Sequence, residues 1–212
     1  MNVADLSLRD FESALASSEP TPGGGTAAAV ALGQAAALTS MVASLTLGSE
    51  RWADGHDAAR RALEEAKQVR RDALDLGDED ALAFDAVMDS FRLPKDTDEQ
   101  KAARRAAIRA ATLHAAEVPM RTAERARALL GHVHAMVQHG NPNAVSDAGM
   151  ASLLASAAAK GAVFNVQINL DALPLDHGVD LRARLPLLRE DIRLLGRQCM
   201  EGVRLRMDAQ RT

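Results

Sequence analysis

The chain has 212 residues, of which 47% are apolar and 25% charged, and this composition predicts a single globular domain large enough to bury a core. A formal net charge of −4 argues against a general nucleic-acid-binding surface. One cysteine excludes an intramolecular disulfide framework and a cysteine zinc cluster, and with an acidic start that lacks a signal-peptide pattern it favours a cytoplasmic protein.

A short amphipathic helix is expected near the start of the chain. Ser7 followed by Asp10 resembles a capping box, in which side chains bond the free amides of the first turn. Leu8, Phe11 and Leu15 follow at helical spacing, so they share one face of this helix.

The next segment, residues 20–26, reads Pro-Thr-Pro-Gly-Gly-Gly-Thr. Two prolines and three glycines predict a rigid, tight loop, and Thr26 is expected to open the following helix. Because glycines leave no side chains in the way, backbone N–H groups at a helix N-terminus can meet a ligand directly. The loop lacks the Gly-Lys-Ser/Thr ending of a P-loop. A cap that only lets two elements pack closely explains the same residues, so the loop alone does not decide between the two roles.

Residues 26–47 carry no charge, and this length is sufficient to cross a bilayer. The segment is mostly alanine with scattered polar residues, and it lacks the flanking aromatic and basic anchors of a membrane span. We therefore expect a central core helix and no membrane association.

The remaining helices are expected over residues 57–93, 97–119, 119–138, 146–169 and 181–207. Thr97 with Gln100, and Ser146 further on, supply caps, while Pro119 is expected to kink or break its helix. No segment alternates clearly enough for a strand, and residues 163–170, the nearest candidate, read better as helix. The expected fold is therefore all-α, a bundle of long, partly kinked helices forming one domain over residues 1–212.

Asp80 is the clearest candidate for chemistry. It lies at helical spacing within an otherwise apolar stripe, which is formed by Val69, Ala73, Leu76, Phe84, Val87 and Phe91. An inward carboxylate is costly unless it is hydrogen-bonded, and burial tends to raise its pKa, as a general acid or base requires. An inward Asp that caps a neighbouring helix would follow the same pattern. Asp78 and Glu79 lie off this stripe.

Other candidates are ambiguous when they are considered singly. Asp147 follows the cap Ser146, so it would stabilise a helix dipole in any protein. Asn165 and Asn169 share a helix face, where two amides can bind the edge of a heterocycle or bond to another helix. Lys95 reads as an exposed loop lysine. The histidines form no ligand pair at metal-binding spacing, and no metal site is expected.

Taken together, these residues resemble a known family. The motifs that carry the resemblance occur in order at residues 20–26, 83–88, 93–97, 118–120, 140–143, 146–149 and 165–169. The chain is similar to the cyclodeaminase/cyclohydrolase family of folate enzymes, which includes the C-terminal domain of formiminotransferase-cyclodeaminase and stand-alone methenyltetrahydrofolate cyclohydrolases. The resemblance implies an all-helical homodimer that binds a folate small molecule.

Within that family the chain looks closest to the stand-alone cyclohydrolases, so the expected reaction is hydrolysis of 5,10-methenyltetrahydrofolate to 10-formyltetrahydrofolate. The alternatives are formiminotetrahydrofolate cyclodeaminase, which releases ammonia, and a non-catalytic folate-binding or scaffolding homologue. Neither family reaction needs a metal or redox cofactor.

The resemblance also assigns roles to residues. Asp80 would be the general base, Asp147 a second carboxylate that orients water or binds the pterin, and Lys95 an acid or a partner for the substrate carboxylate. The residues that would shape the folate pocket are Pro22, Gly23, Gly24, Gly25, Thr26, Asn141, Asn165 and Asn169.

Overall fold

The computed structural model of the protein describes residues 2–209, and these residues form helices and loops without a strand. The α-helices are α1 (Leu8–Leu15), α2 (Gly24–Leu47), α3 (His56–Arg92), α4 (Asp98–His139), α5 (Val145–Asp171) and α6 (Val179–Ala209). Short 3-10 helices occur at η1 (Val3–Asp5), η2 (Glu50–Gly55) and η3 (Pro142–Ala144). The predicted all-α class is confirmed.

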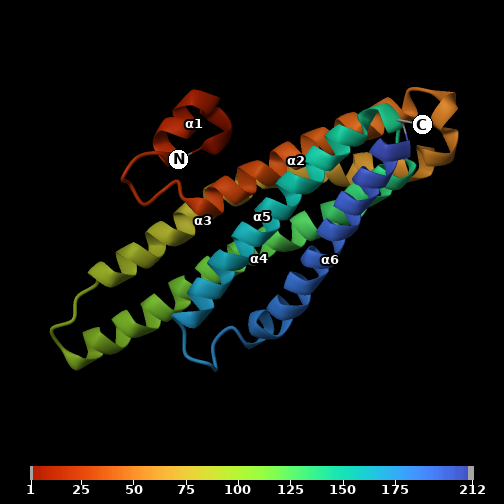
Figure 1. Ribbon diagram of the computed structural model, residues 1–212. Helices are drawn as coiled ribbons and strands as arrows, with labels where there is room; N and C mark the ends of the chain where they lie inside the picture. The colour runs from red at the N-terminus through yellow and green to blue at the C-terminus, as the bar shows by residue number, and fades with distance from the viewer. Residues whose placement is uncertain (1, 210–212) are drawn as a thin grey trace.

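Helices α2 to α5 run alternately up and down and form the body of the bundle (Figure 1). α2 packs against α3 and α5, and α4 packs against the same two helices. α6 lies along α4 and α5, while α1 sits beyond the start of α2 (Figure 1). The end of α3 and the start of α4 project past the rest of the bundle as a hairpin, closed by residues 93–97 (Figure 1).

The uncharged helix α2 is buried along one side only. Leu32, Ala35 and Ala36 have no exposed surface, whereas Met41 and Leu45 on the other side are 39% and 48% exposed. By length and composition, α2 and the segment Pro142–Asp171 could each cross a membrane, and 44% and 50% of their apolar windows are buried inside the protein. The predicted place of α2 in the core is confirmed, but residues 2–209 leave its second face uncovered.

Two expectations about helix boundaries differ from the structure. α2 begins at Gly24, so Thr26 lies within its first turn, and the N-cap Gly23 offers no side-chain cap. The expected break at Pro119 is wrong, because α4 continues through it from Asp98 to His139. The predicted capping box at Thr97 and Gln100 is confirmed, with both reciprocal bonds present.

The apolar stripe of α3 faces two different environments. Val69, Ala73 and Leu76 are buried, as predicted. Phe84 and Phe91 are 40% and 51% exposed, contrary to the expected inward face. The first turn of α2 and the last turns of α5 lie beside Asp80. Helix α3 continues past the start of α2 (Figure 1), so the later part of its stripe has less cover.

Candidate active site

A small cleft opens beside Asp80. It has a volume of about 180 Å³ and lies between the start of α2, the middle of α3, α4 and the end of α5. Its lining residues are Pro20, Thr21, Gly23, Gly24, Gly25, Asp80, Phe84, Ala115, Asn165, Ile168 and Asn169. The cleft thus brings together the three glycines, Asp80 and two asparagines that the sequence had singled out.

Asp80 is the ionisable side chain of the cleft, and it is half-buried. Burial raises the pKa of its carboxyl group, and bonds from the hydroxyl and backbone N–H of Thr26 offset part of that rise. The Thr26 hydroxyl lies 3.4 Å from the Asp80 Oδ2 atom and 3.4 Å from the carbonyl oxygen of Gly77. Within residues 2–209 no cation neutralises Asp80. The Asp80 carboxylate therefore caps the N-terminus of α2 and also faces the cleft. The same position thus suits both roles considered for it, a helix cap and a general acid or base.

Gly25 is what allows this approach. A Cβ atom built at Gly25 would lie 2.2 Å from Oδ1 of Asp80, well inside van der Waals contact. Only a glycine therefore permits the first turn of α2 to touch the carboxylate. Pro22 is buried behind the loop, and the Thr21 hydroxyl donates to Oδ1 of Asp85 at 3.3 Å, which ties the loop to α3.

Asn169 is held by the carbonyl oxygen of Ala115, which Pro119 leaves without its usual helical hydrogen bond. In a regular helix the N–H of residue 119 would donate to the carbonyl oxygen of Ala115, but Pro119 has no N–H. The side-chain amide of Asn169 donates to that oxygen instead, at 2.7 Å. Asn165 donates to the carbonyl oxygen of Gly161 at 3.0 Å. In both asparagines the NH₂ group is thus engaged, and the amide oxygen is available to a ligand that donates hydrogen bonds.

Three predicted site residues lie elsewhere in this chain. Asp147 is at the opposite end of α5, about 27 Å along the helix axis from Asn165. Asn141 is also at that end, where its N–H donates to the Thr46 hydroxyl at 2.9 Å and its side chain caps η3. Lys95 is exposed in the loop between α3 and α4. Among residues 2–209, Asp80 is therefore the one carboxylate that lines the cleft, because Asp147 lies at the opposite end of α5.

The predicted site residues did not include five that line the cleft, namely Pro20, Thr21, Phe84, Ala115 and Ile168. Pro20 and Thr21 belong to the glycine loop that the sequence singled out. Phe84 belongs to the stripe of Asp80, and Ile168 lies three residues after Asn165, so helical spacing contains a signal for both. Nothing in the sequence points to Ala115, because its backbone carbonyl oxygen, and not its side chain, binds Asn169.

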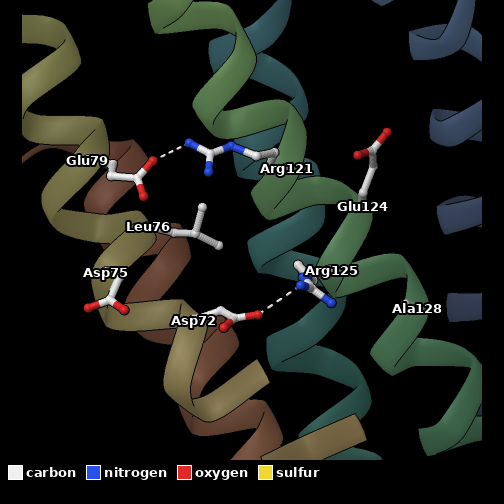
Figure 2. Close-up of a pocket in the computed structure, with 8 residues that line it drawn as sticks. All are labelled: Asp72, Asp75, Leu76, Glu79, Arg121, Glu124, Arg125 and Ala128. Atoms are coloured by element: carbon white, nitrogen blue, oxygen red, sulfur yellow. Dashed lines mark hydrogen bonds and ion pairs between the residues drawn. The ribbon is translucent and has the colours of Figure 1, made fainter. Parts of the chain in front are cut away.

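A larger cavity of about 580 Å³ lies between α3 and α4, and Figure 2 shows its charged lining. Glu79 reaches across to Arg121, and Asp72 approaches Arg125 at 2.9 Å (Figure 2). These two ion pairs tie α3 to α4. Across residues 2–209 no group of three His, Cys, Asp or Glu residues is placed to hold a metal ion.

The raised pKa of Asp80 predicts a pH-dependent effect on stability. A carboxyl group whose pKa is higher in the folded than in the unfolded state stabilises the fold below its unfolded pKa and loses that contribution as the pH rises. Asp80→Asn, which stays neutral, should therefore gain stability relative to the wild type as the pH rises from about 4 to 7. Urea unfolding at each pH measures this, with the exposed Asp75→Asn as control. If the stability of Asp80→Asn relative to the wild type instead increased as the pH falls, burial would not disfavour the charged form of Asp80.

The position of Asn169 should depend on Pro119. Pro119→Ala restores an N–H that competes for the Ala115 carbonyl oxygen, so the Asn169 amide loses its partner. We expect its side-chain NH₂ protons to exchange faster with water, as measured by NMR. Pro186→Ala, at an exposed position inside α6, is the control and should leave the Asn169 signal unchanged. An unaltered exchange rate in Pro119→Ala would show that another contact holds Asn169.

Comparison with known proteins agrees with this arrangement. A family model described as Formiminotransferase-cyclodeaminase matches residues 7–179. The methenyltetrahydrofolate cyclohydrolase of Methylorubrum extorquens is 40% identical over 166 residues, covering 78% of this chain and 80% of that protein. The formimidoyltransferase-cyclodeaminase of Rattus norvegicus is 32% identical over 169 residues, which cover 80% of this chain but only 31% of the rat protein.

A solved structure extends the similarity to the whole fold. The formiminotetrahydrofolate cyclodeaminase of Thermotoga maritima superimposes with a TM-score of 0.81 at 27% sequence identity, covering 99% of this chain and 100% of that one. The family model, the sequence relatives and this fold agree with the motifs around the cleft, and the chain belongs to the formiminotransferase-cyclodeaminase family.

Proposed function

We propose that this protein hydrolyses 5,10-methenyltetrahydrofolate to 10-formyltetrahydrofolate. The observation that carries the proposal is the Asp80 carboxylate, which is half-buried, unpaired with any cation in the described chain and part of a cleft that Asn165 and Asn169 also line. The substrate is a cation at its bridging carbon, so this carboxylate complements it in charge. The 40% identity to a methenyltetrahydrofolate cyclohydrolase of similar extent selects this reaction from those of the family.

The chemistry requires one base and one proton donor, and Asp80 can serve as both in turn. Asp80 takes a proton from water as the oxygen bonds to the bridging carbon, which gives a neutral tetrahedral intermediate. The proton then passes to N5 as the bond between the carbon and N5 breaks. The hydroxyl proton leaves to solvent as the formyl C=O forms on N10, so one proton is released for each cation hydrolysed. No cofactor besides the folate substrate takes part.

The surrounding residues orient the substrate in this scheme. The amide oxygens of Asn165 and Asn169 accept hydrogen bonds from the N–H groups of the pterin. The glycine loop leaves space for the ring beside the start of α2. Asp147 and Asn141 lie too far from Asp80 to act on the same atom within this chain, so the mechanism does not use them.

The alternative is the cyclodeaminase reaction, in which N10 attacks the formimino carbon and ammonia leaves. This alternative is supported by the fold, which this chain shares with the Thermotoga maritima cyclodeaminase. A side-by-side assay separates the two reactions. Loss of methenyl absorbance above the spontaneous rate supports the hydrolase, and ammonia release from formiminotetrahydrofolate without that loss supports the alternative. Absence of both activities would favour a non-catalytic folate-binding homologue.

Substitution of the base should abolish turnover while the protein stays folded. Asp80→Asn keeps the size and much of the hydrogen bonding of the side chain but cannot accept a proton. We expect kcat to fall on the order of 10²–10⁴-fold. Asp75→Asn is the matched control, because Asp75 is exposed on the same helix and lies outside the cleft. Wild-type activity in a folded Asp80→Asn variant would overturn the assignment of the base.

We also propose that the protein is a cytoplasmic homodimer without a nucleic-acid or membrane partner. The uncovered sides of α2 and α5 carry Met41, Leu45, Met150 and Leu153, all exposed by 39–51%. Two adjacent helices about 36 Å long and about 10 Å apart offer a face of roughly 700 Å², near the ~800 Å² that each partner buries in a stable complex. A second copy of the same face would cover it.

Light scattering tests the dimer directly. The wild-type protein should have twice the chain mass of 22.5 kDa at micromolar concentration. Leu153→Glu, which places a charge on this face, should shift the population toward the monomer. Leu187→Glu is the control, since Leu187 is 72% exposed on α6 and should leave the mass unchanged. A monomeric wild-type protein would refute the proposal, and an unaffected Leu153→Glu dimer would place the interface elsewhere.

A further inference from the structure

The stripe beyond Asp80 leads from the cleft to an arginine that has no acidic partner among residues 2–209. Asp80 and Phe91 are eleven residues apart on α3, about three full turns, so they lie on nearly the same face. Ala115 and Arg104 have the same separation on α4, with Ile108 between them. One face of the α3–α4 hairpin therefore has the cleft at one end and Arg104 at the other.

The middle of this face is apolar and open. Phe84 and Phe91 are 40% and 51% exposed, and Ile108 is half-buried. Val87, between the two phenylalanines, packs against the same small cluster that contains Ala115. Apolar side chains thus follow one another along this face of α3 from Phe84 in the cleft to Phe91.

Arg104 sits at the far end with its charge uncompensated. Its Nε and Nη2 atoms donate to the carbonyl oxygen of Phe91 at 3.3 and 3.0 Å, and its guanidinium carbon lies 5.6 Å from the centre of the Phe91 ring. Two nearby cations are paired, Arg92 with Asp89 at 2.7 Å and Lys101 with Asp98 at 3.0 Å. Arg104 has no carboxylate partner among residues 2–209. Capping of the α3 C-terminus accounts for its hydrogen bonds but not for the open aromatic face that leads to it.

We propose that this face, which we call the tail groove (Phe84, Val87, Phe91, Ile108 and Arg104), binds the aminobenzoyl-glutamate part of a tetrahydrofolate. The proposal rests on the proposed function. The aminobenzoyl ring would lie against the phenylalanine rings, and Arg104 would bind a glutamate carboxylate.

The lengths of the groove and of the ligand agree. Phe91 lies about 16 Å from Asp80 along α3. In an extended substrate the γ-carboxylate of the glutamate lies about 13 Å from the bridging carbon, by ordinary bond lengths. The remaining distance is about that of one water molecule between this carbon and Asp80. Lys95, exposed in the adjoining loop, continues the groove toward any further glutamates, in line with its predicted role as a partner for the substrate carboxylate.

Removal of the glutamate from the substrate tests the groove together with Arg104. For the wild-type protein, KM for 5,10-methenyltetrahydropteroate, which lacks the glutamate, should exceed KM for the folate about tenfold. Arg104→Gln should raise KM for the folate by a similar factor, leave kcat unchanged and leave KM for the pteroate unchanged. Arg104→Lys should recover part of the loss. Arg105→Gln, exposed and one residue further around α4, is the matched control.

The same variants are then titrated with 5-formyltetrahydrofolate by calorimetry, which does not depend on turnover. If the wild-type protein turns over neither substrate but Arg104→Gln weakens this binding about tenfold, the groove stands and the proposed function falls. Equal KM for folate and pteroate in an active wild-type protein would overturn the groove and leave the function intact. So would an equal loss for both substrates in Arg104→Gln. No turnover and no binding in the wild type would overturn both.

Discussion

The contact between the Asp80 carboxylate and the first turn of α2 is the constraint on which the rest of the site depends. A carboxylate placed at a helix N-terminus satisfies free N–H groups, and the helix dipole in turn favours its charge. Partial burial acts in the opposite direction and raises the pKa. Gly25 fixes the balance, because any larger residue would push the helix and the carboxylate apart. The close approach of the carboxylate to α2 thus depends on the absence of a side chain at Gly25.

On the other side of the cleft, the missing N–H of Pro119 determines where Asn169 lies. Pro119 deprives α4 of one internal hydrogen bond, and the freed carbonyl group of Ala115 becomes the anchor for Asn169. A residue that would ordinarily weaken a helix thereby supplies a binding partner to its neighbour. The cost to α4 is offset because the carbonyl oxygen stays hydrogen-bonded, which is the general requirement for a buried polar group.

The site lies at the end of the alanine-rich, closely packed part of the bundle. Small side chains such as Ala29, Ala36 and Ala159 are fully buried and let α2, α3 and α5 pack closely. The cleft forms where α2 begins and α5 ends, beyond this closely packed part of the bundle. Beyond that point the hairpin of α3 and α4 keeps its apolar stripe with less cover, and this is where the proposed tail groove lies.

The sequence by itself determined the helical class, the caps at Ser7 and Thr97, and the inward placement of Asp80, because these follow from local spacing and backbone chemistry. The family resemblance added the folate substrate and the roles of the site residues. Only the tertiary structure decided which of the predicted site residues lie together in the cleft. Asp147 and Asn165 lie on one helix, yet its length places them at opposite ends of the bundle. The role of Pro119 was also hidden, because a missing N–H becomes a binding partner only when another helix brings an amide to the freed oxygen.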